Sequence, residues 1–327
     1  MKKDFKTGLI VLFVLILIIC GVTVTSFYMP NNINITSSSI YKVDYTKNYK
    51  GQYVGLVYLT GTIEEKNNEY NQDWILNTIS KLKDDKKNLG MVLYIDSPGG
   101  SVYQADQVYF ALKEYKASGK ALEVYMGPLA ASGGYYIACA ADEIWANRNT
   151  LTGSIGVIAG QTFEITKLLD NLGIKSETIH AGKNKNMGNY NEPLSDEQRA
   201  ILQSVADECY DQFTLIVSND RNIPLEKVQK IADGRIYTAK QAQELKLVDK
   251  VTSWDSMVDD LRINELNNSD CKIVEFKVPQ SNSIMDILNY AKTSIGNERT
   301  ASSMGIPLSV AQKINAQRQY PAFIYEN

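Results

Sequence analysis

The sequence contains a single histidine, His180, and few cysteines. Histidine-dependent triads, Cys-His pairs and multi-histidine metal sites would all require that one residue. The four cysteines form no CxxC pair, so a disulfide framework and a zinc site both lack their usual sequence support. We therefore expect neither a metal nor a cofactor. Cys139 follows an apolar stretch and is expected to pack in the core, whereas no role is assigned to Cys20, Cys209 or Cys271.

A basic excess is also absent, because 34 Lys and Arg residues stand against 37 Asp and Glu residues, for a formal charge of −3. Nucleic-acid binding needs cationic side chains that neutralise phosphates, so nucleic acid is not expected as a partner. The 327 residues are 44% hydrophobic and 22% charged, which is typical of a globular protein and excludes disordered or collagen-like chains. No tandem repeat is present.

The N-terminal part of the chain predicts a membrane anchor. Residues 8–29 carry no charged side chain, and a helix of that length, at ~1.5 Å per residue, crosses the ~30 Å hydrocarbon core of a bilayer. Lys2, Lys3 and Lys6 precede this stretch, so the positive-inside rule places residues 1–7 in the cytoplasm and the rest of a single-pass protein outside the cell membrane. A cleaved signal peptide is the alternative, although its apolar region usually spans ~7–15 residues. The polar residues 30–50 are predicted to form a tether.

From residue 51 the pattern alternates between strands and helices. Strands are expected at residues 53–59, 91–95 and 122–126, and helices at residues 73–83, 104–117, 197–219 and 225–231. This alternation predicts an α/β fold with a largely parallel sheet. The second and third strands lead into glycine turns at residues 96–100 and 127–128, and ligands bind outside the carboxyl ends of such strands. The site is therefore expected in these turns, and a looser region is expected from about residue 264.

Ser132 is the candidate nucleophile. It lies among small residues after a strand and at the start of an apolar helix, where a peptide backbone can approach and free N–H groups can stabilise an oxyanion. The N–H of Gly133 would be one such donor, and Gly100 or Gly99 would supply a second if the two strands are neighbours. The alternative role for Ser132 is a helix N-cap. Rival nucleophiles in less favourable settings are Ser97, Ser101 and Ser154.

The general base has two kinds of candidate. His180 is one, although no aspartate is obviously placed to orient it. The other is a lysine of residues 182–188, either Lys183 or Lys185. A lysine accepts a proton only as the neutral amine, which burial in an apolar site favours, so a Ser-Lys dyad is chemically adequate. The usual place of a lysine in a polar loop is solvated surface.

Several ordered motifs together resemble the short bacterial form of the signal peptide peptidase A family. They are DSPGGS at 96–101, AASGGYYIA at 130–138, LTGSIGV at 151–157, GKNK at 182–185, ADGRIYTAKQA at 232–242 and LVD at 247–249. The resemblance implies a Clp-protease/crotonase-type fold and a membrane-bound serine protease, without a cofactor, that degrades signal peptides left in the bilayer. It implies Ser132 as nucleophile and Lys185 as base. Ser154 would position the lysine, and Gly100 and Gly133 would donate to the oxyanion.

The resemblance also implies a homo-oligomer, an octamer in which neighbouring subunits supply the serine and the lysine of each site. Residues 51–260 would form the protease domain, and residues 261–327 a C-terminal region and tail. The end of the chain, residues 320–327, is similar to the aromatic tail of the family, and we expect that it can lie in the substrate groove. Two alternatives differ in function: a crotonase-like acyl-transfer or hydrolase enzyme, and a non-enzymatic membrane scaffold.

Overall fold

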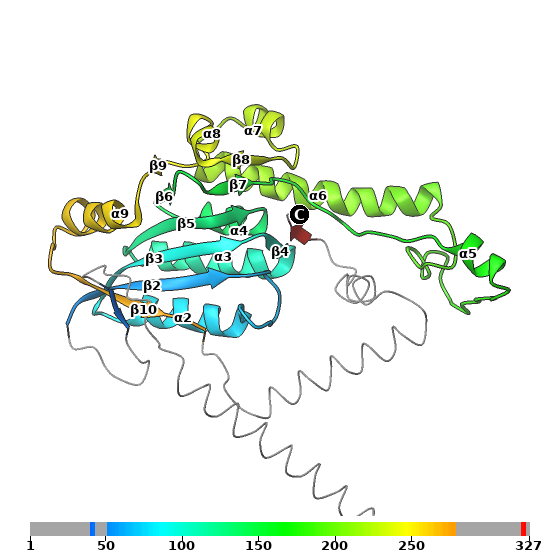
Figure 1. Cartoon of the computed structure of the whole chain (residues 1–327), viewed down its shortest axis with the longest axis horizontal. Helices are drawn as coiled ribbons and strands as arrows, with labels where there is room; N and C mark the ends of the chain where they lie inside the picture. The colour runs from blue at the N-terminus through cyan, green and yellow to red at the C-terminus, as the bar shows by residue number, and fades with distance from the viewer. Residues whose placement is uncertain (1–39, 43–50, 279–321, 325–327) are drawn as a thin grey trace, which may run out of the picture. The chain divides into compact units, whose positions relative to one another are not determined.

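The computed structural model describes residues 40–42, 51–278 and 322–324, and strands and helices alternate through most of them (Figure 1). The strands are β1 (Ile40–Lys42), β2 (Tyr53–Thr60), β3 (Asn88–Ser97), β4 (Gly99–Ser101), β5 (Ala121–Ala131), β6 (Glu143–Ala146), β7 (Leu151–Gly153), β8 (Ile236–Thr238), β9 (Lys250–Val251), β10 (Lys272–Phe276) and β11 (Ala322–Ile324). The helices are α2 (Gln72–Asp84), α3 (Val102–Ala117), α4 (Gly133–Ala138), α5 (Thr166–Asn171), α6 (Asp196–Asp220), α7 (Leu225–Ile231), α8 (Ala239–Glu244), α9 (Trp254–Asp260) and a π-helix (Leu261–Glu265). None of these helices is long and apolar enough to cross a membrane, and the predicted anchor at residues 8–29 lies outside the described ranges.

A nine-stranded sheet forms the centre of the domain. Its order is β1-β10-β2-β3-β5-β6-β9, and β7 pairs with β5 and with β8. Every pair is parallel except β7 with β8. The predicted α/β fold with a largely parallel sheet is thus confirmed. A separate antiparallel pair joins β4 to β11, close to the C-terminus.

Buried apolar side chains cover both faces of the sheet. On one face, the large residues Tyr115, Tyr135, Tyr136 and Phe213 are fully buried in a core that α2, α3, α4 and α6 share with the strands. The other face packs against α9 and the π-helix in a smaller core. Cys139 is buried in the larger core, as predicted.

The turn predicted at residues 127–128 is wrong, because β5 continues through Gly127 and Pro128 to Ala131. The ladder between β3 and β5 shifts its register between Ile95 and Ser97, which accommodates the extra residues as an irregularity. Beyond it, residues 129–131 pair with β7. Gly127 leaves room here, since a Cβ atom at this position would lie 2.6 Å from the Tyr94 hydroxyl. This distant pairing extends the strand, and local sequence does not reveal it.

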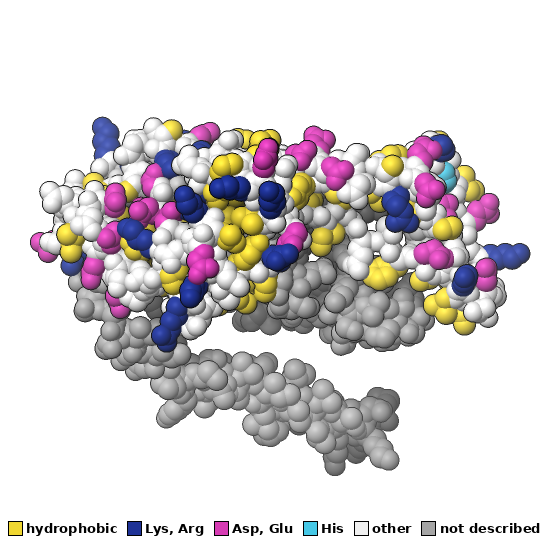
Figure 2. Space-filling view, turned by 90° about the horizontal axis from the view of Figure 1, so that it is seen from above, with side chains coloured by type: hydrophobic (Ala, Val, Ile, Leu, Met, Phe, Trp, Pro, Cys, Tyr) yellow, Lys and Arg dark blue, Asp and Glu magenta, His cyan; other side chains and the backbone are white. Residues whose placement is uncertain are grey.

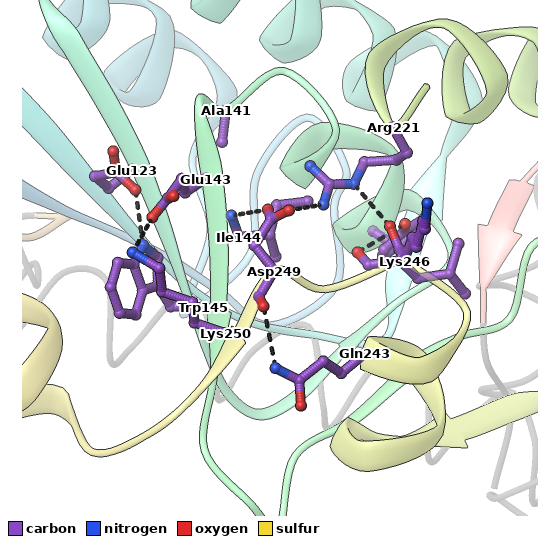
Figure 3. A network of polar contacts seen from close by, with 12 residues as sticks. Glu123, Ala141, Glu143, Ile144, Trp145, Arg221, Gln243, Lys246, Asp249 and Lys250 are labelled. Atoms are coloured by element: carbon purple, nitrogen blue, oxygen red, sulfur yellow. Dashed lines mark hydrogen bonds and ion pairs between the residues drawn. The ribbon is translucent and has the colours of Figure 1, made fainter. Parts of the chain in front are cut away.

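Two polar clusters fix the strands β5, β6 and β9 (Figure 3). In one, the Asp249 carboxylate accepts from Arg221 Nη2 at 2.6 Å and from the Ile144 N–H at 2.8 Å. In the other, the buried Glu123 carboxylate accepts from Trp145 Nε1 at 2.8 Å. Burial raises the pKa of Glu123 to about 8, and the carboxylate of the neighbouring Glu143 adds to this effect.

Residues 157–195 form an arm that extends away from the sheet, together with the first half of α6 (Figure 1). The arm has almost no core of its own: its helix α5 buries no residue, and the segment at residues 178–182 is an exposed loop. Hydrophobic side chains lie on its surface, at the right of Figure 2. They are Ile158, Phe163, Leu168, Leu172, Ile174, Ile179 and Tyr190.

Candidate active site

The segment around Gly100 and the segment around Ser132 lie side by side, at the carboxyl ends of β3 and β5. These strands are neighbours, and Ser97 is in register with Ala130. The helix that follows Ser132 begins with glycines that allow close approach, since a Cβ atom at Gly134 would lie 3.2 Å from the Ser97 carbonyl oxygen. The Gly100 turn and the Ser132 turn are therefore in contact, which is the condition for a shared oxyanion hole.

Ser132 has a strained backbone, with φ 54° and ψ −118°. This conformation lies outside the regions that L-residues normally occupy and costs ~1–3 kcal/mol. Two hydrogen bonds hold it: the Ser132 N–H donates to the Gly153 carbonyl at 2.8 Å, and the Tyr136 N–H donates to the Ser132 carbonyl at 2.9 Å. Strain of this kind persists only where the surrounding structure enforces it, and it concentrates at functional sites.

The Ser132 hydroxyl is buried and has no hydrogen-bond partner among the described residues. It makes no capping bond to α4, so the interpretation of Ser132 as a side-chain N-cap is wrong. A buried polar group without a partner is costly, and native structures rarely keep one without a reason. The first turn of α4 also leaves backbone N–H groups, that of Gly133 among them, without acceptors inside the helix. The arrangement suits a nucleophile beside an oxyanion hole.

Gly100 lies against Ile63, a residue that sequence reasoning missed. The Ile63 N–H donates to the Gly99 carbonyl, and the Ser101 N–H donates to the Ile63 carbonyl, both at 2.8 Å. Backbone groups alternate along an extended strand, so the N–H and C=O of Gly100 face the opposite edge, where β11 pairs and Phe323 is in register with Gly100. A Cβ atom at Gly100 would lie 1.9 Å from the Ile63 carbonyl oxygen, so only glycine fits. No local sequence signal identifies Ile63, because its contact with β4 is a single isolated bridge.

The rival serines occupy different positions. The Ser97 hydroxyl donates to the Gly61 carbonyl at 2.6 Å and accepts from the Gly99 N–H at 3.1 Å, so it supports the glycine turn. Ser154 lies one residue beyond β7, beside Ser132, because Ala131 is in register with Gly153. Its φ is 49°, and its N–H donates to the Arg235 carbonyl at 2.8 Å. Ser132 and Ser154 are thus brought together.

The candidate bases lie on the arm. Lys183 pairs with Glu197 on the first turn of α6, and Asn184 donates to the same carboxylate at 3.2 Å. The hydrogen bond from Lys183 lowers the pKa of Glu197 below its ordinary value. Lys185 is exposed, and no ion pair to it is present in the described part of the chain. His180 is exposed on the same arm, with Nδ1 3.1 Å from the Gly182 carbonyl oxygen.

The structure does not bring these bases to Ser132 within one chain. The lysine loop contacts the start of α6 at Glu197, whereas Phe213, further along α6, packs against the Tyr136 ring at 5.1 Å between centroids. At ~1.5 Å per residue, these two points on the helix are about 24 Å apart, far more than the length of a lysine side chain.

One further polar residue near the Gly100 turn is an aspartate. Asp96 accepts from the Leu129 N–H at 3.2 Å, and burial raises its pKa, with a further contribution from Glu69. Within the described residues, no group of three or more His, Cys, Asp or Glu side chains is arranged to hold a metal ion.

The chain is similar in sequence to known peptidases. Residues 114–267 match the model of peptidase family S49. The chain is 30% identical over 246 residues to a protein assigned as signal peptide peptidase SppA in Enterococcus faecium. The matched region covers 75% of this chain and 69% of that protein. It is 32% identical over 247 residues to the chloroplastic serine protease SPPA of Arabidopsis thaliana, covering 74% of this chain but 36% of that protein. A protein assigned as a protease in Methanocaldococcus jannaschii is 29% identical over 97% of this chain and 98% of its own length.

Proposed function

The chain belongs to peptidase family S49 and is a serine peptidase, and from that premise we propose that it is a membrane-anchored endopeptidase that degrades cleaved signal peptides with a Ser-Lys dyad. The observation that carries the proposal is Ser132, whose buried hydroxyl has no partner among the described residues and whose strained backbone is held by hydrogen bonds to Gly153 and Tyr136. The name of the Enterococcus relative supports the substrate class, and the name of the Arabidopsis relative supports a serine protease. The motifs support a Clp-protease/crotonase-type fold.

In the proposed mechanism, the neutral Lys185 amine takes the proton of the Ser132 hydroxyl as the oxygen attacks the scissile carbonyl. The N–H groups of Gly100 and Gly133 stabilise the oxyanion. The lysine ammonium then returns the proton to the leaving amine, which departs as the C–N bond breaks. Water hydrolyses the acyl-enzyme by the same route. Ser154, beside Ser132, would position the lysine.

Two observations favour Lys185 over Lys183 as the base. The Lys183 ammonium is held in an ion pair with Glu197 on the first turn of α6. Lys185 has no such pair among the described residues. Its loop is ordered by amides, since the buried Asn186 accepts from Asn189 at 2.7 Å and donates to Asn191 at 3.2 Å.

The position of the arm supports a homo-oligomer with shared sites. The lysine loop lies against Glu197, about 24 Å along α6 from Phe213, which packs on Tyr136 near Ser132, so a lysine of this loop would serve a serine in another protomer. The arm also exposes seven large hydrophobic side chains, which is typical of a protein interface. We propose that the arm packs on a neighbouring protomer, in an octamer as in the short bacterial form, and brings Lys185 to that protomer's Ser132.

The substrate would bind as an added strand. Backbone hydrogen bonds to an exposed strand edge give affinity without demanding a sequence. The β11 strand, from the C-terminal tail, pairs in this way with β4 beside Gly100, which supports the proposal that the tail can occupy the substrate groove. The apolar residues 8–29 would anchor the enzyme in the cell membrane, where substrate is concentrated.

Hydrolysis of a short apolar peptide with a fluorogenic leaving group tests the dyad. Ser132→Ala and Lys185→Ala should both lose activity while remaining folded and assembled. Lys183→Gln is the matched control, because it removes a lysine of the same loop and should remain active. Full activity of Lys185→Ala would refute Lys185 as the base.

Mixing two inactive variants tests the shared site. Mixed oligomers of Ser132→Ala and Lys185→Ala contain some sites with both residues intact, so part of the activity should return. A mixture that stays inactive, although mixed oligomers are shown to form, would instead favour a site within one chain.

The tail proposal has a separate test. Intact-mass analysis of the native protein and of Ser132→Ala should show a shortened C-terminus only in the native protein if the tail enters the groove and is cleaved. Equal shortening in both would exclude self-processing.

A further inference from the structure

Tyr136 connects the nucleophile to a polar cluster formed by three helices. Its hydroxyl donates to the Asp106 carboxylate of α3 at 2.5 Å and accepts from the Gln212 amide of α6 at 2.6 Å. Gln212 also donates to Asp106 at 3.2 Å. The Tyr136 residue is fully buried in α4, and burial, together with the bond to Asp106, raises the pKa of the phenol, so the hydroxyl stays protonated as a donor.

The backbone of the same residue holds Ser132. The Tyr136 N–H donates to the Ser132 carbonyl at 2.9 Å, while the Ser132 N–H is held by Gly153. One bond fixes the N–H of Ser132 and the other fixes its carbonyl, so together they hold the strained φ and ψ. The Gly153 side is fixed by the pairing of β7 with β5. The Tyr136 side depends on α4, a helix of six residues, and so short a helix is not stable by itself.

The cluster also joins the parts of the molecule that the proposed mechanism needs together. Helix α3 begins directly after the Gly100 turn, α4 begins directly after Ser132, and α6 starts at the lysine-bearing arm. On its other side α4 is held once more, because the Tyr135 hydroxyl donates to the Leu247 carbonyl at 3.0 Å. The hydrogen bond from the Tyr136 hydroxyl to Asp106 links α4 to α3, the helix that follows Gly100.

We propose that Asp106, Tyr136 and Gln212 are positioning residues that keep Ser132 in its strained, reactive conformation and hold the Ser132 turn against the Gly100 turn. None of the three touches the substrate. They act through the Tyr136 backbone on Ser132 and through α3 on Gly100. The inference rests on the proposed role of Ser132 as nucleophile, and it identifies the residues that hold Ser132 in place.

Tyr136→Phe tests the inference because it removes one hydroxyl and keeps the ring packed against Phe213 and Tyr109. Tyr109→Phe is a matched control: its hydroxyl also bonds α3 to α6, through Asp220 at 2.6 Å, but makes no bond to α4. In the purified full-length chain, Tyr136→Phe should lower kcat about tenfold, or about 1.4 kcal/mol in the barrier, with KM unchanged. The rate at which a fluorophosphonate labels Ser132 should fall by a similar factor. Tyr109→Phe should keep both rates within about twofold of the wild type.

Variants of Asp106 supply a rescue test. Asp106→Asn retains an oxygen that accepts the Tyr136 hydroxyl and should keep most of the activity, whereas Asp106→Ala should behave like Tyr136→Phe. If Tyr136→Phe does not fold, Gln212→Met, which removes only the amide bonds, is judged by the same kcat criterion.

The outcomes separate this inference from the proposed function. Wild-type rates in Tyr136→Phe, or an equal loss in Tyr109→Phe, would overturn the positioning role while Ser132 remains the nucleophile. Failure of the fluorophosphonate to label Ser132 in the wild type would refute the nucleophile itself.

Discussion

Gly100→Ala tests the glycine turn most directly. The added Cβ would lie 1.9 Å from the Ile63 carbonyl oxygen, whereas real Cβ contacts essentially never fall below 3.0 Å, so the strand must move by about 1.1 Å. That movement disturbs the bonds of Ile63 to Gly99 and Ser101 and turns the Gly100 N–H away from the oxyanion position. A misplacement of ~1 Å costs about 10²-fold in rate, and loss of one oxyanion donor costs about 10²–10³-fold. We expect kcat/KM to fall by about 100- to 1,000-fold.

The assay pairs peptide hydrolysis with thermal unfolding. Loss of one or two hydrogen bonds should lower the free energy of unfolding by ~1–3 kcal/mol, which leaves the fold intact. Gly119→Ala is the control, because Gly119 has φ +82° and open space around it, so an alanine there costs ~1–2 kcal/mol by backbone strain alone. Gly119 lies beyond the far end of α3 and its variant should retain activity. If Gly100→Ala keeps more than about half of the wild-type activity, Gly100 is not an oxyanion donor.

Three further predictions concern Ser132, Glu123 and the general base. Ser132→Gly should be inactive yet more stable than Ser132→Ala by ~1 kcal/mol in chemical denaturation, because glycine adopts the positive φ without strain, and equal stability would contradict the strain argument. Burial raises the pKa of Glu123 from 4.5 to about 8, so the folded protein retains a proton that the unfolded chain releases, and stability falls as the pH rises through that window. Glu123→Gln should therefore gain melting temperature relative to the wild type from about pH 5 to pH 8, and a constant difference would argue against the buried proton. Peptidase activity should rise from neutral to mildly alkaline pH, because only a neutral amine accepts the Ser132 proton, and a flat profile would speak against a lysine base.

Much of the fold follows from local patterns in the sequence. The strands at 53–59 and 91–95 and the helix at 225–231 were predicted because apolar periodicity is a property of neighbouring residues. The continuation of β5 to Ala131 was not predicted, because the pairing with β7 that extends it depends on residues some twenty positions away.

The site divides in the same way. Small residues around Ser132 and the glycine turn at residues 96–100 identify the candidate nucleophile and the candidate oxyanion donors from sequence alone. The support for these groups is not visible there: Ile63 touches Gly100 from 37 positions earlier, and Asp106 reaches Tyr136 across 30 positions. Such contacts carry no local signal, since the residues meet only after the sheet and helices have packed.

The sequence by itself determined the class of fold, and it predicts an anchor at residues 8–29 and Ser132 as the nucleophile, because each depends on residue types at short spacing. Only the tertiary structure decided that the Gly100 turn and the Ser132 turn touch, that Ser132 is strained, and that its hydroxyl has no partner in the part of the chain that the structure describes. It also decided that the lysines lie on an arm remote from Ser132. The physical reason is the parallel sheet: its neighbouring strands are far apart along the chain, so what meets at their carboxyl ends is settled by long-range pairing.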